Sequence, residues 1–150
     1  MALTVLKNTD QESVIKITGI GSETIDLQTT ILAATQALSG ATQTVNIVGI
    51  EYTGLTGSTI TIVRNSVTVT SLMAEGHDAV GLASGFGFVE STENTSDIVV
   101  TIGTANAQCY LTLRKVSGYA SKVENATYGA YDDPTRIGAS TTMSGSPDKV

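Results

Sequence analysis

Apolar and polar side chains alternate most regularly over residues 97–116. A period of two residues is that of a pleated strand with one buried face. Two apolar rows result, formed by Ile98, Val100 and Ile102 and then by Ala107, Cys109, Leu111 and Leu113. The loop between them contains Gly103 and Asn106, which is typical of a β-hairpin. We therefore predict that residues 97–116 form a hairpin and that its strands are the central pair of the core.

A second hairpin is predicted over residues 59–70. Its two runs are rich in β-branched residues, and Arg64, Asn65 and Ser66 separate them. Asparagine tolerates the positive φ of a tight turn, so the turn chemistry agrees with the alternation. Shorter apolar or alternating runs predict further strands at residues 3–7, 14–17, 24–27, 45–52 and 86–89.

Residues 29–44 leave two alternatives open. A short helix would contain the apolar run that begins at Ile31 and would end at Gly40 as a C-terminal cap. The threonines in this stretch disfavour a helix, because β-branching restricts their rotamers. We favour extended structure with a turn at Ser39 and Gly40.

The character of the sequence changes after Val116. Residues 117–150 lack aliphatic alternation and contain both prolines, so they cannot form a core of their own. They are either a disordered tail or an extended arm that docks on a neighbouring subunit. Tyrosine offers a large contact area and a polar group, and the interface candidates in this segment are Tyr119, Val123, Tyr128, Tyr131 and Ile137.

Together these elements predict an all-β protein with a single β-sandwich or jelly-roll-like barrel of about eight strands. The sandwich domain is expected over residues 1–116, and the arm over residues 117–150.

Charged residues make up 15% of the chain, well below the roughly 25% of an ordinary domain. Such a surface suits contact with another protein, where every charge must be desolvated or paired.

The charge balance argues against nucleic acid as a partner. The net charge is −6, and the few basic residues are scattered, whereas phosphate binding needs them clustered. The largest basic group is Arg114 with Lys115, which we interpret as a solvated strand end. No run approaches the roughly 20 apolar residues of a membrane span, and no signal peptide is recognisable, so we expect no membrane partner.

No group of residues in the sequence predicts catalysis. His77 lies in a polar, glycine-rich stretch and is expected to be an exposed loop residue, not a metal ligand. Cys109 alternates with apolar residues and is expected to be buried and unreactive. Asp132 and Asp133 precede a proline and are more simply explained by a turn. The remaining acidic candidates are isolated from one another: Asp26, Glu51 and Glu90. We expect no enzyme, no cofactor and no bound metal.

Three stretches of the sequence resemble a known class of protein. They are ALTVLKNT (residues 2–9), NTSDIVVTI (94–102) and AQCYLTLRKVSGYASK (107–122). These sequences are similar to those of small structural proteins from tailed phages of aquatic bacteria, in particular capsid decoration (cement) proteins. The similarity extends in order over most of residues 1–138 and contains no mechanistic motif.

The resemblance implies a role in the virion. Its implied partners are the major capsid protein and further copies of the same chain, with a trimer as the usual state. Such a protein is assembled in the host cytoplasm, binds the outer surface of the phage head and stabilises the shell by bridging capsomers. The competing hypothesis is a phage tail or fibre component, a β-sandwich binding module for a cell-surface glycan. Exposed aromatic side chains would favour that alternative, but Tyr52 and Phe86 are the only two candidates that the sequence offers for such a site.

Overall fold

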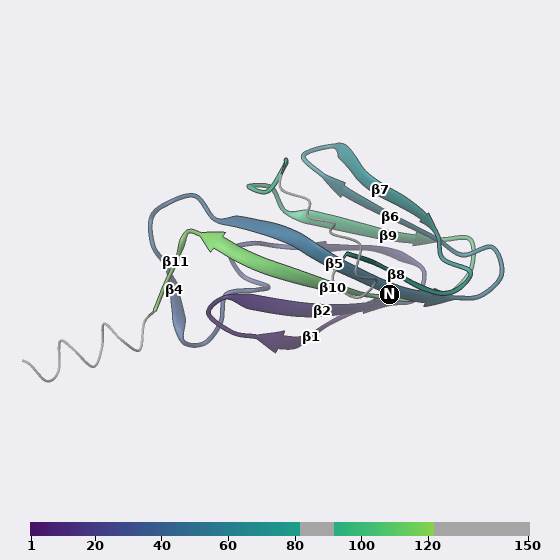
Figure 1. Ribbon diagram of the computed structural model, residues 1–150, viewed down its shortest axis with the longest axis horizontal. Coiled ribbons are helices and arrows are strands. Elements are labelled where there is room, and N and C mark those ends of the chain that lie inside the picture. Colours follow the sequence, from purple (N-terminus) through teal and green to yellow (C-terminus); the bar gives the residue numbers. More distant parts are fainter. Residues whose placement is uncertain (82–91, 122–150) are drawn as a thin grey trace, which may run out of the picture.

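The structure is a computed structural model that describes residues 1–81 and 92–121 (Figure 1). The described residues form an all-β fold without a helix, as the alternation predicts. Its strands are β1 (Ala2–Asn8), β2 (Glu12–Thr18), β3 (Gly21–Ile25), β4 (Gln36–Leu38), β5 (Thr44–Gly54), β6 (Thr59–Arg64), β7 (Val67–Met73), β8 (Gly76–Gly81), β9 (Ile98–Gly103), β10 (Ala107–Ser117) and β11 (Tyr119–Ser121).

Two antiparallel sheets face each other as the layers of a sandwich (Figure 1). The first sheet has the strand order β1-β2-β10-β5-β8, and the second has the order β3-β9-β6-β7. Neither closes into a barrel. A separate ribbon of β4 and β11 lies at one end of the sandwich, where β10 finishes (Figure 1).

The core lies between the two sheets and consists of the side chains that point inward, which are every second residue along a strand. Burial alternates residue by residue along β2, β6, β9 and the first part of β10. The apolar side chains that fill this space are mostly isoleucine, valine and leucine: Ile15, Ile17, Ile47, Ile50, Leu111 and Leu113 from the first sheet, and Ile25, Ile60, Ile62, Ile98, Val100 and Ile102 from the second. Isoleucine and valine, which branch at Cβ, suit this pleated, half-buried setting.

The predicted hairpin over residues 97–116 is wrong. Both runs are strands, but β9 pairs with β3 and β6 in the second sheet, whereas β10 pairs with β2 and β5 in the first. The loop that joins them, in which Thr104 has a φ of 71°, crosses from one sheet to the other. The two apolar rows face each other across the core instead of lying side by side. Each strand is nevertheless interior to its sheet, so the segment is central to the fold.

The predicted hairpin over residues 59–70 is confirmed. Strands β6 and β7 pair in antiparallel register, with Arg64 opposite Val67. Asn65 and Ser66 form the turn with φ values of 49° and 62°. Two consecutive positive φ angles give the twist that a two-residue hairpin loop needs.

Of the two alternatives for residues 29–44, the extended one is confirmed. The segment contains turns and the short strand β4 but no helix, and Gly40 has a φ of 91° at the predicted turn. Strand β8 was not predicted, because its sequence GHDAVG lacks an aliphatic alternation. The strand predicted at residues 86–89 lies outside the described residues.

Residues 117–121, which the sequence assigned to the arm, belong to strands except for Gly118, which lies between β10 and β11. Strand β10 continues to Ser117, and β11 pairs with β4 of the same chain. Gly118 allows this change of direction because its φ is 92° and a Cβ there would lie 2.5 Å from the Cα of Gln43. The rest of the predicted arm, residues 122–150, lies outside the described residues.

Candidate functional site

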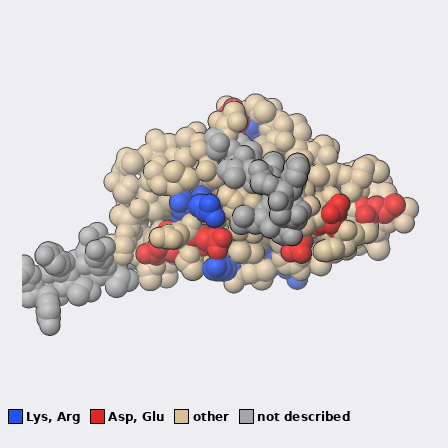
Figure 2. All heavy atoms as spheres, in the orientation of Figure 1, with Lys and Arg blue, Asp and Glu red and all other residues tan. Residues whose placement is uncertain are grey.

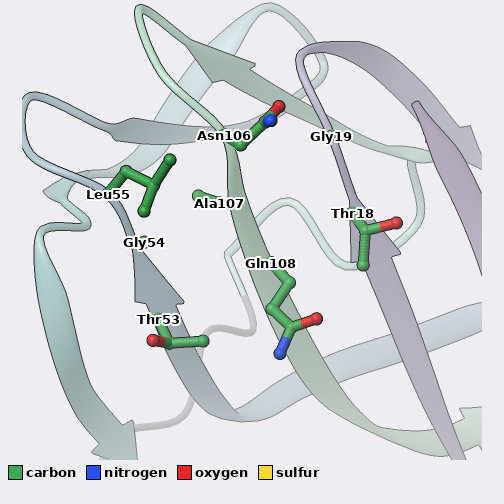
Figure 3. Close-up of a pocket in the computed structure, with 8 residues that line it drawn as sticks. All are labelled: Thr18, Gly19, Thr53, Gly54, Leu55, Asn106, Ala107 and Gln108. Carbon is green, nitrogen blue, oxygen red and sulfur yellow. The ribbon is translucent and has the colours of Figure 1, made fainter.

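The sandwich end at which β10 begins carries a shallow pocket of about 420 Å³, which we call the end pocket (Figure 3). Its lining comes from three neighbouring strands of the first sheet and the loops beside them: Thr18, Gly19, Thr53, Gly54, Leu55, Asn106, Ala107 and Gln108.

Strand register places the polar side chains of the end pocket next to one another. Gln108 of β10 lies opposite Thr18 of β2 on one side and opposite Thr53 of β5 on the other. The loops are fixed by two backbone hydrogen bonds of 3.0 Å, from Gly19 N to the carbonyl of Ala107 and from Leu55 N to the carbonyl of Asn106. The pocket is therefore built on paired backbone and not on a free loop.

Close packing behind the end pocket restricts its residues. A Cβ at Gly54 would lie 2.4 Å from the carbonyl oxygen of Ala74 and 2.9 Å from the side chain of Ser58. Ser58 is fully buried, and its hydroxyl donates to the carbonyl of Asn106 at 2.7 Å. Glycine is thus required at position 54 because neighbouring backbone occupies the space of a side chain.

The end pocket offers hydrogen bonds and an apolar wall but no charge. Two hydroxyls and the amides of Gln108 and Asn106 are available, and Leu55 stands at the rim with 62% of its surface exposed (Figure 3). None of the lining residues is acidic, basic or aromatic. Such a site suits an uncharged side chain with a polar tip, since a buried charge would find no partner there.

The opposite end of the sandwich carries a polar cluster around Lys115. The Lys115 Nζ donates to Asn8 Oδ1 at 2.9 Å, to the Thr9 carbonyl at 2.8 Å and to Gln36 Oε1 at 2.6 Å. It also lies 5.1 Å from the centroid of the Tyr119 ring, a distance at which an ammonium group is attracted to an aromatic face. Lys115 therefore joins the β1–β2 turn to both strands of the β4–β11 ribbon.

Burial shifts the titration of both members of this contact. It lowers the pKa of Lys115 to about 8, and the charge of Asp10 acts in the opposite direction. Burial, followed by the charges of Asp26 and Asp97, raises the pKa of Tyr119 to about 12. The expectation that Arg114 and Lys115 form a solvated strand end thus holds for exposed Arg114 and is wrong for Lys115.

Of the five interface candidates, the described residues include Tyr119. Its ring is half-buried against the core, and its hydroxyl donates to the Leu27 carbonyl at 2.5 Å. These contacts are with its own chain. The other four candidates, Val123, Tyr128, Tyr131 and Ile137, lie outside the described residues, as do Asp132, Asp133 and Glu90.

The remaining candidates do not come together. His77 is exposed as expected but lies in strand β8, with its Nε2 3.6 Å from Glu51 Oε2. Asp26 is used in a turn, where its Oδ1 accepts from the backbone of Gln28 at 2.7 Å. Among residues 1–81 and 92–121, no three His, Cys, Asp or Glu side chains are grouped closely enough to hold a metal ion. The same residues contain no helix that could cross a membrane.

The burial of Cys109 is confirmed, since its side chain is 0% exposed. Burial raises the pKa of its thiol to about 12. Tyr52, considered above for glycan binding, is only 7% exposed and offers little of its ring for stacking on a sugar.

The sequence contained an overlooked signal for two cations, buried Arg64 and partly buried Lys115. Arg64 follows Ile60 and Ile62 at the inward spacing of β6, and Lys115 follows Leu111 and Leu113 in β10. The expectation of a turn at Arg64 and of a solvated strand end at Lys115 does not take that spacing into account. For the end pocket no such signal exists, because Thr18, Thr53 and Gln108 are far apart in the sequence.

Comparison with known proteins does not assign this chain to a family. No family model matches the sequence, and no curated protein matches it either.

Proposed function

We propose that this protein is a structural component of a tailed-phage virion, a capsid decoration protein that binds the outer surface of the head and bridges capsomers. Its partners would be the major capsid protein and other copies of itself, with a homotrimer as the expected state. Its activity would be attachment without chemistry, so neither an enzymatic reaction nor a cofactor is part of the proposal.

The observation that carries the proposal is an uncharged pocket on a sandwich with few charged side chains. Most of the face shown in Figure 2 carries neither acidic nor basic side chains, and the end pocket has none at all. Burying a surface of this kind against another protein costs little desolvation free energy, because few charges leave water. Several weak contacts made by one oligomer then add up through multivalency. The resemblance of residues 94–102 and 107–122 to decoration proteins supports the same conclusion.

The glycan-binding alternative has less support from the described residues. A sugar site commonly uses an exposed aromatic face, but the end pocket contains no aromatic residue. Tyr52 is buried, and Phe86 lies outside the described residues. We therefore prefer decoration to a tail or fibre function.

Quantitative mass spectrometry of purified virions tests the proposal. A decoration protein should be present at a simple ratio to the major capsid protein, because it occupies repeated positions on the shell. A copy number that follows the tail proteins would support the fibre alternative. Absence of the chain from intact particles would refute a virion function altogether.

A further inference from the structure

The end pocket has the chemistry of a receptor for an uncharged side chain with a polar tip, and it is large enough to hold one. Its volume of about 420 Å³ is within the usual range for small-ligand sites. The apolar wall at Leu55 suits a ring, whereas Thr18, Thr53 and Gln108 supply hydroxyl and amide groups that suit a phenol. Tyrosine combines these two requirements in one side chain.

The chain itself contains a matching segment beyond β11. Residues 126–131 read Ala-Thr-Tyr-Gly-Ala-Tyr and carry no charge, with acidic Asp132 directly after them. We propose that the end pocket of one subunit receives Tyr128 from the C-terminal segment of a second copy. This inference rests on the proposed oligomer and names the surface that would hold it together.

Chain length indicates that the tyrosine comes from another copy. The end pocket lies at the first residues of β10, and the chain leaves that strand at Ser117, about 33 Å away at the rise of an antiparallel strand. Strand β11 lies at this far end (Figure 1). Tyr128 follows Ser121 by seven residues, which cover at most about 24 Å. It therefore falls short of its own pocket, whereas the pocket of a neighbour is not subject to this limit.

Exchange of this kind can close a ring. The donor segment and the acceptor pocket are different surfaces, so each contact is heterologous, and a rotational arrangement satisfies every copy equally. A trimer would contain one occupied pocket in each subunit.

Cysteine cross-linking of the full-length protein tests the inference. Leu55→Cys places a thiol at the exposed rim of the pocket, and Thr127→Cys places one beside Tyr128 without removing the phenol. Native Cys109 is fully buried and contributes little background. With a short bismaleimide, the double variant should give products linked between chains. Adding Tyr128→Ala should abolish them.

Val67→Cys paired with Thr127→Cys is the matched control, because Val67 is 48% exposed and lies at the other end of β7, opposite Arg64 and away from the pocket. Equal linking between chains at Val67, linking within one chain at Leu55, or linking that survives Tyr128→Ala would overturn the inference. Sedimentation of a Leu55→Arg variant is an independent test of the pocket contact. A folded variant that keeps the oligomeric mass of the wild type would also overturn the inference. Co-purification with virions is scored separately, so that a failed pocket contact can be distinguished from a failed decoration function.

Discussion

At the scale of single residues, the most unusual group is the buried guanidinium of Arg64. It is 0% exposed at the end of β6 and donates to carbonyls from two other segments. Nη1 reaches Val45 O at 2.7 Å, and Nε and Nη2 reach Ser96 O at 3.0 and 2.7 Å. Because Val45 belongs to β5, this side chain fastens the second sheet to the first.

Replacing Arg64 should therefore destabilise the sandwich. Arg64→Met removes the donors and leaves buried carbonyls without them, which we expect to lower the free energy of unfolding by about 2–4 kcal/mol. Arg64→Lys should recover only part of the loss, since an ammonium group lacks the fork geometry. Urea denaturation measures both, with exposed Arg114→Met as the control. If the Arg114 and Arg64 variants lose the same stability, this role for Arg64 is wrong.

Cys109 predicts a loss of stability in alkaline solution. Its thiol has a pKa of about 12 in the fold, against an ordinary value of 9.0. Between these values the unfolded chain releases a proton that the folded chain keeps, so stability falls as pH rises through this window, by about 1.4 kcal/mol per pH unit.

The comparison that isolates this effect is with Cys109→Ala. Between pH 8 and pH 10.5, the wild type should lose about 2 kcal/mol more than the variant, because only the wild type carries the thiol. Denaturation curves at the two pH values measure the difference. Parallel losses in the two proteins, or rapid labelling of the native thiol, would show that Cys109 is accessible.

At the scale of elements, the β4–β11 ribbon depends on the turn at Gly118. Gly118 and Gly40 have nearly the same φ, 92° and 91°, but different surroundings. A Cβ at Gly118 would meet backbone of Gln43 and Thr42 at 2.5–2.7 Å, whereas nothing lies within 4 Å of one at Gly40.

This pair separates the cost of backbone conformation from the cost of close packing. Gly40→Ala should lower the free energy of unfolding by about 1–2 kcal/mol, which is the left-handed penalty alone. Gly118→Ala should lower it by about 3 kcal/mol or more, because the backbone must also move apart. Urea midpoints of the two variants measure the difference. Equal effects would mean that the approach of Gly118 to Gln43 is relaxed in solution.

For the molecule as a whole, the strands continue past Val116, the expected end of the sandwich, at least to Ser121. Strand β11 pairs with β4. Tyr119 packs against the core, and its hydroxyl donates a hydrogen bond to the Leu27 carbonyl. Truncation after Ser121 keeps these contacts, whereas truncation after Val116 should lower the free energy of unfolding, relative to the 1–121 chain, by about 1–2 kcal/mol through loss of the half-buried ring.

The same truncations test assembly. If the C-terminal segment joins the subunits, the 1–121 chain should be a folded monomer in sedimentation, while the full chain has the mass of an oligomer. A 1–121 chain that keeps the full oligomeric state would show that residues 122–150 do not hold the assembly together. A 1–116 chain as stable as 1–121 would contradict the role assigned to β11.

The pattern of the sequence was enough to predict which residues of β9 and β10 face inward and where the tight turn between β6 and β7 lies. The rows that end in Ile102 and Leu113 are buried as predicted, and Asn65 turns the β6–β7 hairpin. The threonines of residues 29–44 correctly argued against a helix. These features are local: a period of two fixes the face of a strand, and a positive φ selects residues that tolerate it.

Which strands are neighbours follows from the folded structure and not from the alternation. Alternation is the same whether β9 and β10 pair with each other or face each other across the core, so the sequence could not distinguish a hairpin from a crossing between sheets. The end pocket exists because long-range register brings Thr18, Thr53 and Gln108 together. Arg64 is buried and Lys115 partly buried because carbonyl and amide oxygens from distant segments converge on them. Pairing and burial of this kind are set by contacts between residues far apart in the chain, which no local pattern encodes.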